Sequence, residues 1–195
     1  EVFRTHGKIY EASASQMFGV PLERIKKGNP EYELRQRGKV AELALGYQGS
    51  VSAMRAMDTG HQLDNLSDDE VKDIVNRWRD TNPKIRDLWY AFDSAAIEVI
   101  QNGGSVSVRG CTLAREYDYK QNRICLSIQL PSGRKLFYVD PAIGENRWGN
   151  PSITYMGLND KNKWGRIETY GGKLVENCVQ AIARDCLAQA IEHLE

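Results

Sequence analysis

Residues 35–47 read RQRGKVAELALGY, and this stretch decides how the rest of the chain is interpreted. It lies in a run from Glu31 to Gly46 that is rich in Leu, Ala, Glu, Arg and Lys, which predicts a long helix. Because four residues advance roughly 400° around a helix, side chains at that interval form one slowly drifting stripe, here about 18 Å long. Four side chains stand at this interval: Arg35, Lys39, Leu43 and Tyr47.

The stripe carries two cations, then an aliphatic side chain, then an aromatic ring. A nucleoside triphosphate needs these groups in this order, because cations hold phosphates, an apolar side chain packs on the sugar and an aromatic ring meets the base. The alternative is a solvated helix edge on which the two cations form ion pairs with Glu31 or Glu42. Spacing alone favours this alternative, since any Lys-rich helix produces such stripes.

Start and stop signals define further helices. A helix over 8–18 ends at Gly19, and a short one covers 50–57. The capping box from Ser67 to Glu70 opens a helix that runs to about residue 80, and Asn82-Pro83 opens another that runs to about 102. A final helix over 173–194 follows two glycines.

The pattern changes between the last two helices. Short alternating segments over 105–139 predict a small antiparallel β-region of three or four strands. Residues 140–170 contain many Gly and Pro, so they are expected to be mostly loop. The expected fold class is therefore α+β, mainly helical, with a long C-terminal helix.

The charge balance excludes one class of protein. The chain has 195 residues with 26 Lys and Arg against 26 Asp and Glu, so it does not hold nucleic acid by bulk charge alone. The charges are uneven along the chain, however. Residues 109–173 hold eleven basic against six acidic side chains, and residues 64–98 hold five against nine. This distribution is expected of a protein that touches DNA on one side only.

We expect no membrane-spanning segment, no disulfide bond and no zinc site. No apolar run approaches the ~20 residues that a membrane span needs. The four cysteines include no CxxC pair, and the three histidines are scattered without partners at metal-ligand spacing. Cys178 and Cys186 lie eight residues apart, on one face of the last helix, and are expected to be buried there as small apolar side chains.

Several motifs in order resemble the family A DNA polymerases, the group of bacterial DNA polymerase I, and most closely their phage and prophage versions. Arg35, Lys39 and Tyr47 match the signature of the fingers helix in register. The other similar segments cover most of the chain: 9–20 before the fingers helix, 74–99 with Trp78, Asn82-Pro83 and Trp89, the hairpin at 132–136, and 171–185, which resembles the palm helix.

The resemblance implies an organisation and a role for each matching residue. Residues 1–104 would be a helical fingers region, 105–170 a β and loop region and 171–195 the palm helix, all parts of one polymerase domain. Arg35 and Lys39 would bind the phosphates of the incoming dNTP, and Tyr47 would lie near the templating base. Leu43 stands where the family usually has Phe or Tyr, at the position that touches the sugar.

The same resemblance implies partners and a cofactor. Gln180 matches the palm glutamine that reads the minor groove of the primer–template duplex, and Asn177 and Arg184 share its helix face. The parent enzyme would be a nucleotidyltransferase that replicates DNA with Mg²⁺, in the cytoplasm of a bacterial or phage-infected cell. The carboxylate motifs that hold the metals in the family, Asp-x-Ser-x-Ile-Glu and His-Asp-Glu, do not occur in this chain.

We therefore expect no catalytic or metal-binding residues among the 195, and no primer extension by this chain without the remainder of a polymerase. Two alternatives stay open at this point. One is a non-catalytic module that binds nucleotide or DNA. The other is a helical interaction domain with a β-insert and no role with nucleic acid.

Overall fold

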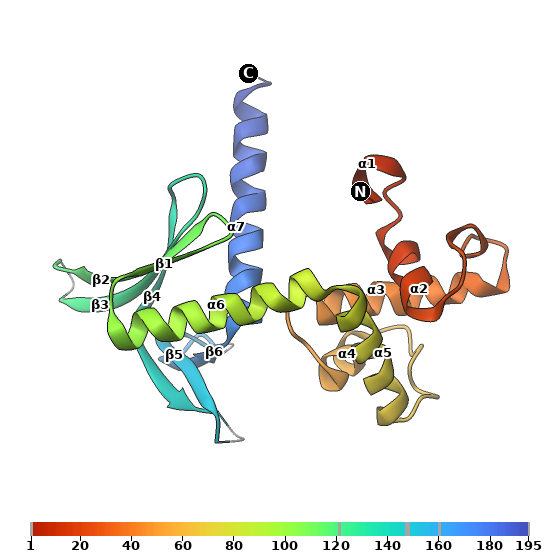
Figure 1. Cartoon of the computed structure of the whole chain (residues 1–195), viewed down its shortest axis with the longest axis horizontal. Helices are drawn as coiled ribbons and strands as arrows, with labels where there is room; N and C mark the ends of the chain where they lie inside the picture. The colour runs from red at the N-terminus through yellow and green to blue at the C-terminus, as the bar shows by residue number, and fades with distance from the viewer. Residues whose placement is uncertain (1, 121, 147–148, 160, 195) are drawn as a thin grey trace. The chain divides into compact units, whose positions relative to one another are not determined.

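The computed structural model describes residues 2–120, 122–146, 149–159 and 161–194 (Figure 1). The chain divides into two compact units, Glu1–Asp87 and Leu88–Glu195. Helix α6 (Pro83–Asn102) begins in the first unit and continues into the second. No helix within the described ranges combines the length and the apolar character needed to cross a membrane.

The helix signals in the sequence of the first unit are confirmed. Helix α2 (Ile9–Phe18) ends at Gly19, which takes the left-handed conformation with φ 66°. Helix α5 (Asp68–Thr81) begins after a complete capping box, in which the side chains of Ser67 and Glu70 each accept a bond from the other's backbone N–H. Helix α6 begins at Pro83, as predicted.

The first unit is built around helix α3 (Leu34–Leu45), which contacts α2, α4 (Val51–Met57) and α5. The 3₁₀ turn η2 (Pro30–Glu33) runs directly into α3, so the helical stretch begins near the predicted residue but its first turn is tighter. A short helix α1 (Val2–Thr5) and the 3₁₀ turn η1 (Leu22–Arg24) complete the unit. Its core side chains are fully buried, among them Ala14, Leu45, Met54, Leu63 and Trp78.

The second unit contains a six-stranded antiparallel sheet in which every strand pairs with its neighbour in sequence, within the described residues. The strands are β1 (Ser105–Val108), β2 (Cys111–Asp118), β3 (Arg123–Gln129), β4 (Lys135–Glu145), β5 (Pro151–Leu158) and β6 (Trp164–Thr169). In register, Leu113 pairs with Ile128 and Leu126 with Tyr138. These four side chains are buried, so one face of β2–β4 contributes to the core of this unit.

The expectation that residues 140–170 are mostly loop is wrong. Strand β4 continues to Glu145, and β5 and β6 form a further hairpin. Pro151 is the first residue of β5, where it does not interrupt the strand. Gly157 and Gly165 pair directly with each other across the β5–β6 ladder. Breaker residues therefore sit inside or at the start of paired strands, which local pattern alone does not distinguish from loop.

Helix α7 (Gly171–Glu192) begins two residues earlier than predicted. Gly171 is buried, and its N–H donates to Oδ1 of Asp93 in α6 at 2.9 Å. A Cβ on Gly171 would lie 1.9 Å from the carbonyl oxygen of Trp89, so glycine here permits close packing of α7 on α6 rather than a flexible link. Burial in this contact raises the pKa of the Asp93 carboxyl.

The cysteine prediction for this helix is half right. Cys178 is buried, as expected, whereas Cys186 is exposed. The helix is buried only in its N-terminal half, through Gly171, Gly172, Leu174, Val175 and Cys178. Cys186 lies in the second half of the helix, where most side chains are exposed.

Candidate functional site

The predicted stripe is only partly helical. Arg35, Lys39 and Leu43 lie on α3, but this helix ends at Leu45 and Tyr47 stands in the turn that follows, where it is half-buried. The next residue, Gln48, has a left-handed backbone with φ 67°. The chain therefore changes direction around Tyr47, and the periodicity that predicted a fourth helical member does not extend that far.

Arg35 is paired within the protein. Its Nε donates to Oε1 of Glu11 in α2 at 2.9 Å, and its guanidinium carbon lies 5.4 Å from the ring centre of Tyr10 and 5.9 Å from that of Tyr32. Neither Glu31 nor Glu42, the two acids that the sequence suggested, is the partner of Arg35. The partner comes from α2 because α2 and α3 cross closely, which the spacing within α3 does not reveal.

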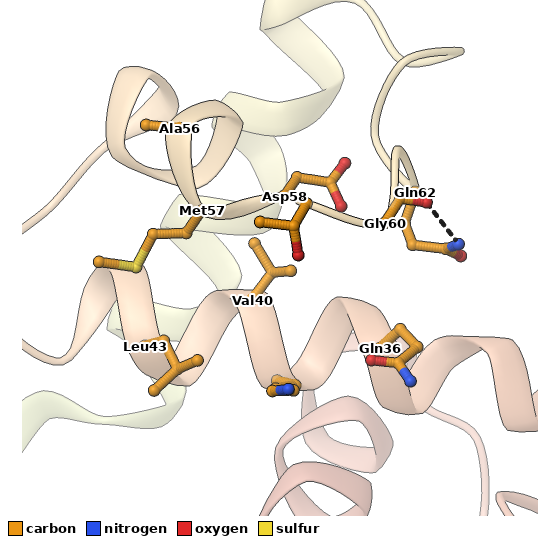
Figure 2. A pocket seen from close by; sticks show the side chains of 10 residues that line it. Gln36, Val40, Leu43, Ala56, Met57, Asp58, Gly60 and Gln62 are labelled. Atoms are coloured by element: carbon orange, nitrogen blue, oxygen red, sulfur yellow. Dashed lines mark hydrogen bonds between the residues drawn. The ribbon is translucent and has the colours of Figure 1, made fainter.

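Lys39 is exposed, and no ion pair or hydrogen bond joins its side chain to any residue that the structure describes. Together with Leu43 it lines a pocket of about 580 Å³ between α3 and the segment that follows α4. Figure 2 shows Gln36, Val40 and Leu43 on one side of this pocket and Met57, Asp58, Gly60 and Gln62 on the other. The structure thus brings Lys39 and Leu43 to one cavity, whereas Arg35 and Tyr47 do not line it.

The far wall of the pocket is held in shape by two charged side chains. Asp58 is buried, and its Oδ2 accepts a bond from the N–H of Leu63 at 2.7 Å. Arg55 donates to the carbonyl oxygens of Leu63 and Leu66 and to Asp68. Spacing along the sequence does not reveal that residues 58–60 lie opposite α3 in this pocket.

The three α7 residues differ in what they contact. Asn177 donates from Nδ2 to the hydroxyl of Tyr138 in β4 at 2.9 Å, so its amide joins α7 to the sheet. Gln180 is exposed and donates to Glu176 on its own helix at 3.1 Å. Arg184 is exposed one turn further along. Gln180 and Arg184 therefore present polar groups to solvent from one side of α7.

A second contact on α7 was not expected from the sequence. The turn between β3 and β4 docks onto the helix, because Ser132 donates to Oδ2 of Asp185 at 2.6 Å and Arg134 donates to its Oδ1 at 2.8 Å. Arg134 also donates to the carbonyl oxygen of Ala181 at 2.9 Å. The hydrogen bond from Ser132 is the largest cause that holds the pKa of the Asp185 carboxyl below its ordinary value, and the hydrogen bond from Arg134 acts in the same direction.

The candidate residues thus form two groups on separate units. Arg35, Lys39 and Leu43 lie in the first unit, and Gln180 and Arg184 lie in the second. Nowhere in the described ranges do three or more His, Cys, Asp or Glu side chains come close enough together to hold a metal ion.

One comparison with known proteins gives a strong similarity. The chain is 48% identical over 197 residues to the DNA polymerase of Bacillus phage SP02, and the match covers all of this chain but 29% of that polymerase. The chain therefore spans less than a third of the length of this relative. No protein-family model matches the chain, and no solved structure matches it.

Proposed function

We propose that this chain is the fingers region and part of the palm of a family A DNA polymerase. Two observations support the proposal. The motifs of the fingers helix, the hairpin and the palm helix occur in the family's order, and the whole chain is similar to part of a phage DNA polymerase. Because the similarity covers 29% of that relative, the activity of the whole enzyme is itself part of the proposal.

In this role α3 binds the incoming dNTP. Arg35 and Lys39 bind the phosphate oxygens, Leu43 packs against the sugar and Tyr47 lies towards the base. The observation that carries the proposal is the position of Lys39. It is an exposed cation that shares a pocket of about 580 Å³ with an apolar neighbour, Leu43, which is 45% exposed. Such a pocket offers both a charge for phosphate and an apolar surface for a sugar.

The second unit would contact the primer–template duplex. In this proposal Gln180, which is exposed on α7, donates a hydrogen bond to the acceptors of the base edges in the minor groove. Arg184, exposed on the same helix, is suited to a phosphate. Asn177 is the weakest of the three as a DNA contact, because its amide already donates to Tyr138.

A DNA polymerase uses Mg²⁺ to activate the primer hydroxyl and neutralise the leaving phosphates. Two carboxylates near α3 are already engaged within the protein. Glu11 is engaged with Arg35, and Asp58 is buried and accepts from Leu63. We therefore assign the metal ligands to the remainder of the polymerase and propose that the 195 residues alone do not extend a primer.

The test is a titration of the chain with dATP, followed by the backbone amide shifts in NMR. Lys39→Ala and Arg35→Ala each remove one cation from the site, and each is expected to weaken binding by about tenfold. Lys72→Ala is the matched control, because it removes an exposed lysine from α5, outside the pocket. Shifts that do not cluster on α3, or equal affinities for all four proteins, would exclude the nucleotide site.

A primer-extension assay completes the test. The chain with Mg²⁺, dNTPs and a primed template is expected to leave the primer unextended. Sustained incorporation by the purified 195 residues would show that the metal ligands lie within this chain after all.

A further inference from the structure

Arg35 forms an ion pair with Glu11 of the same chain. The Nε–H of Arg35 and Oε1 of Glu11 are 2.9 Å apart, and the two side chains are 27% and 14% exposed. A partly buried pair is screened less by salt than a fully exposed pair, but it is still screened. The negative charge of Glu11 therefore acts directly on whatever approaches Arg35.

The same contacts fix the orientation of the guanidinium. The rings of Tyr10 and Tyr32 lie 5.4 and 5.9 Å from its central carbon, within the range of cation–π contacts. Glu11 occupies the Nε edge. In the part of the chain that the structure describes, neither terminal nitrogen of Arg35 has a hydrogen-bond acceptor, so these two donors remain available to an oxyanion.

We propose that Glu11 is both the positioning residue and the built-in counter-charge of Arg35. It holds Arg35 by Nε, so that the terminal nitrogens stay available, and at the same time lowers the affinity of the site for phosphate. This inference rests on the proposed function, in which Arg35 binds the phosphates of a nucleotide. It adds that the affinity is limited by a residue of α2, a helix that does not line the pocket.

The two effects of Glu11 are separable by substitution. Glu11→Gln keeps the length of the side chain and an oxygen that accepts from Nε, but it removes the charge. Glu11→Ala removes both the charge and the acceptor. If orientation and charge both matter, the first variant gains affinity for phosphate and the second gains less, because Arg35 loses its anchor.

The experiment is a calorimetric titration of the 195-residue chain with tripolyphosphate and with dATP, at low and at high salt. Glu11→Gln is expected to bind tripolyphosphate about three- to tenfold more tightly than the wild type, because a nearby negative charge is gone. The gain is expected to shrink at high salt, which a purely structural effect would not do. Glu23→Gln is the control, since it removes an exposed carboxylate from the same unit.

The possible outcomes separate this inference from the proposed function. If Arg35→Ala binds as tightly as the wild type, or if neither the wild type nor Glu11→Gln binds measurably, the proposed phosphate site itself fails. If Arg35→Ala binds more weakly but Glu11→Gln does not bind more tightly than the wild type, only the role of Glu11 is overturned. Circular dichroism checks the fold of each variant, and the isosteric Glu11→Gln carries the test should Glu11→Ala not fold.

Discussion

Gly38 of α3 lies against the backbone carbonyl of Tyr10 in α2. A Cβ on Gly38 would be 2.2 Å from that oxygen and 3.1 Å from the Cβ of Ala14. A backbone oxygen inside a helix cannot swing aside as a side chain can. Gly38→Ala is therefore expected to push α2 away from α3 and to lower the free energy of unfolding by about 1–3 kcal/mol. Urea denaturation followed by circular dichroism measures this change.

The matched control is Gly60→Ala in the same unit. The nearest atom to a Cβ there is Cγ of Gln62 at 3.7 Å, an ordinary contact. Its free energy of unfolding is expected to stay within about 0.5 kcal/mol of the wild type. Equal losses in the two variants would mean that the α2–α3 crossing is not as close as the structure shows.

Gln48 offers a gain in stability. Its φ of 67° is a left-handed conformation that costs a residue with a Cβ about 1 kcal/mol or more and costs glycine almost nothing. Gln48→Gly is expected to raise the free energy of unfolding by up to about 1 kcal/mol.

A Gln→Gly substitution within a helix of the same unit is expected to lower the free energy of unfolding instead of raising it. Gln36 lies inside α3, where glycine is unfavourable by roughly 0.5–1 kcal/mol. Gln36→Gly should therefore lower stability in the same urea experiment. A loss of stability in both variants would contradict the argument from the backbone of Gln48.

The helices were predictable because their signals are local. The capping box at Ser67, the left-handed Gly19 and the proline at position 83 each act within one turn of the helix end that they define. A sequence read in short windows contains all of that information. The predicted bounds of α2 and α6 accordingly agree with the structure to within a residue or two.

The second half of the sheet was missed because its signals are not local. Gly157 and Gly165 are loop residues by composition, and only their pairing across the β5–β6 ladder shows their role. Gly171 was expected to stand just before the last helix, yet it is helical and its lack of a side chain is what lets α7 approach Trp89. In both cases the contact that explains the residue joins it to a partner that a short stretch of sequence does not reveal.

The position of the candidate residues follows only in part from the sequence. The spacing on α3 identified Lys39 and Leu43, and the structure places both on one pocket. The spacing could not show that Glu11 pairs with Arg35, because that contact depends on how α2 crosses α3. Nor could it show where the helix ends, which removes Tyr47 from the regular stripe.

The contact between the β3–β4 turn and α7 is expected to depend on pH. The hydrogen bonds from Ser132 and Arg134 lower the pKa of Asp185 in the folded protein, so the folded state binds a proton less readily than the unfolded chain. The stabilisation is therefore fully present above the unfolded pKa of about 4 and is lost as the pH falls through the lower folded pKa.

Asp185→Asn tests this dependence. The variant is expected to be less stable than the wild type at neutral pH, and the difference should shrink as the pH falls below about 4. Denaturation with urea across this pH range measures it. Asp73→Asn, which alters an exposed carboxylate on α5, should show no such convergence. A difference that stays constant with pH would show that the charge of Asp185 is not what holds the turn.

Asn177 and Arg184 are expected to act differently although they lie on the same helix. Tyr138 is buried and its hydroxyl accepts from Asn177, so Asn177→Ala leaves a buried polar group without its partner. This variant should lose about 1–3 kcal/mol of stability.

Arg184→Ala should keep its stability, but it should lower the slope of log affinity against log salt for duplex DNA by about 1, because one phosphate contact is gone. Filter binding to a primer–template duplex at several salt concentrations, together with urea denaturation, measures both quantities. The reverse result, a salt effect from Asn177→Ala and none from Arg184→Ala, would move the DNA contact to the residue that the structure uses to join α7 to the sheet.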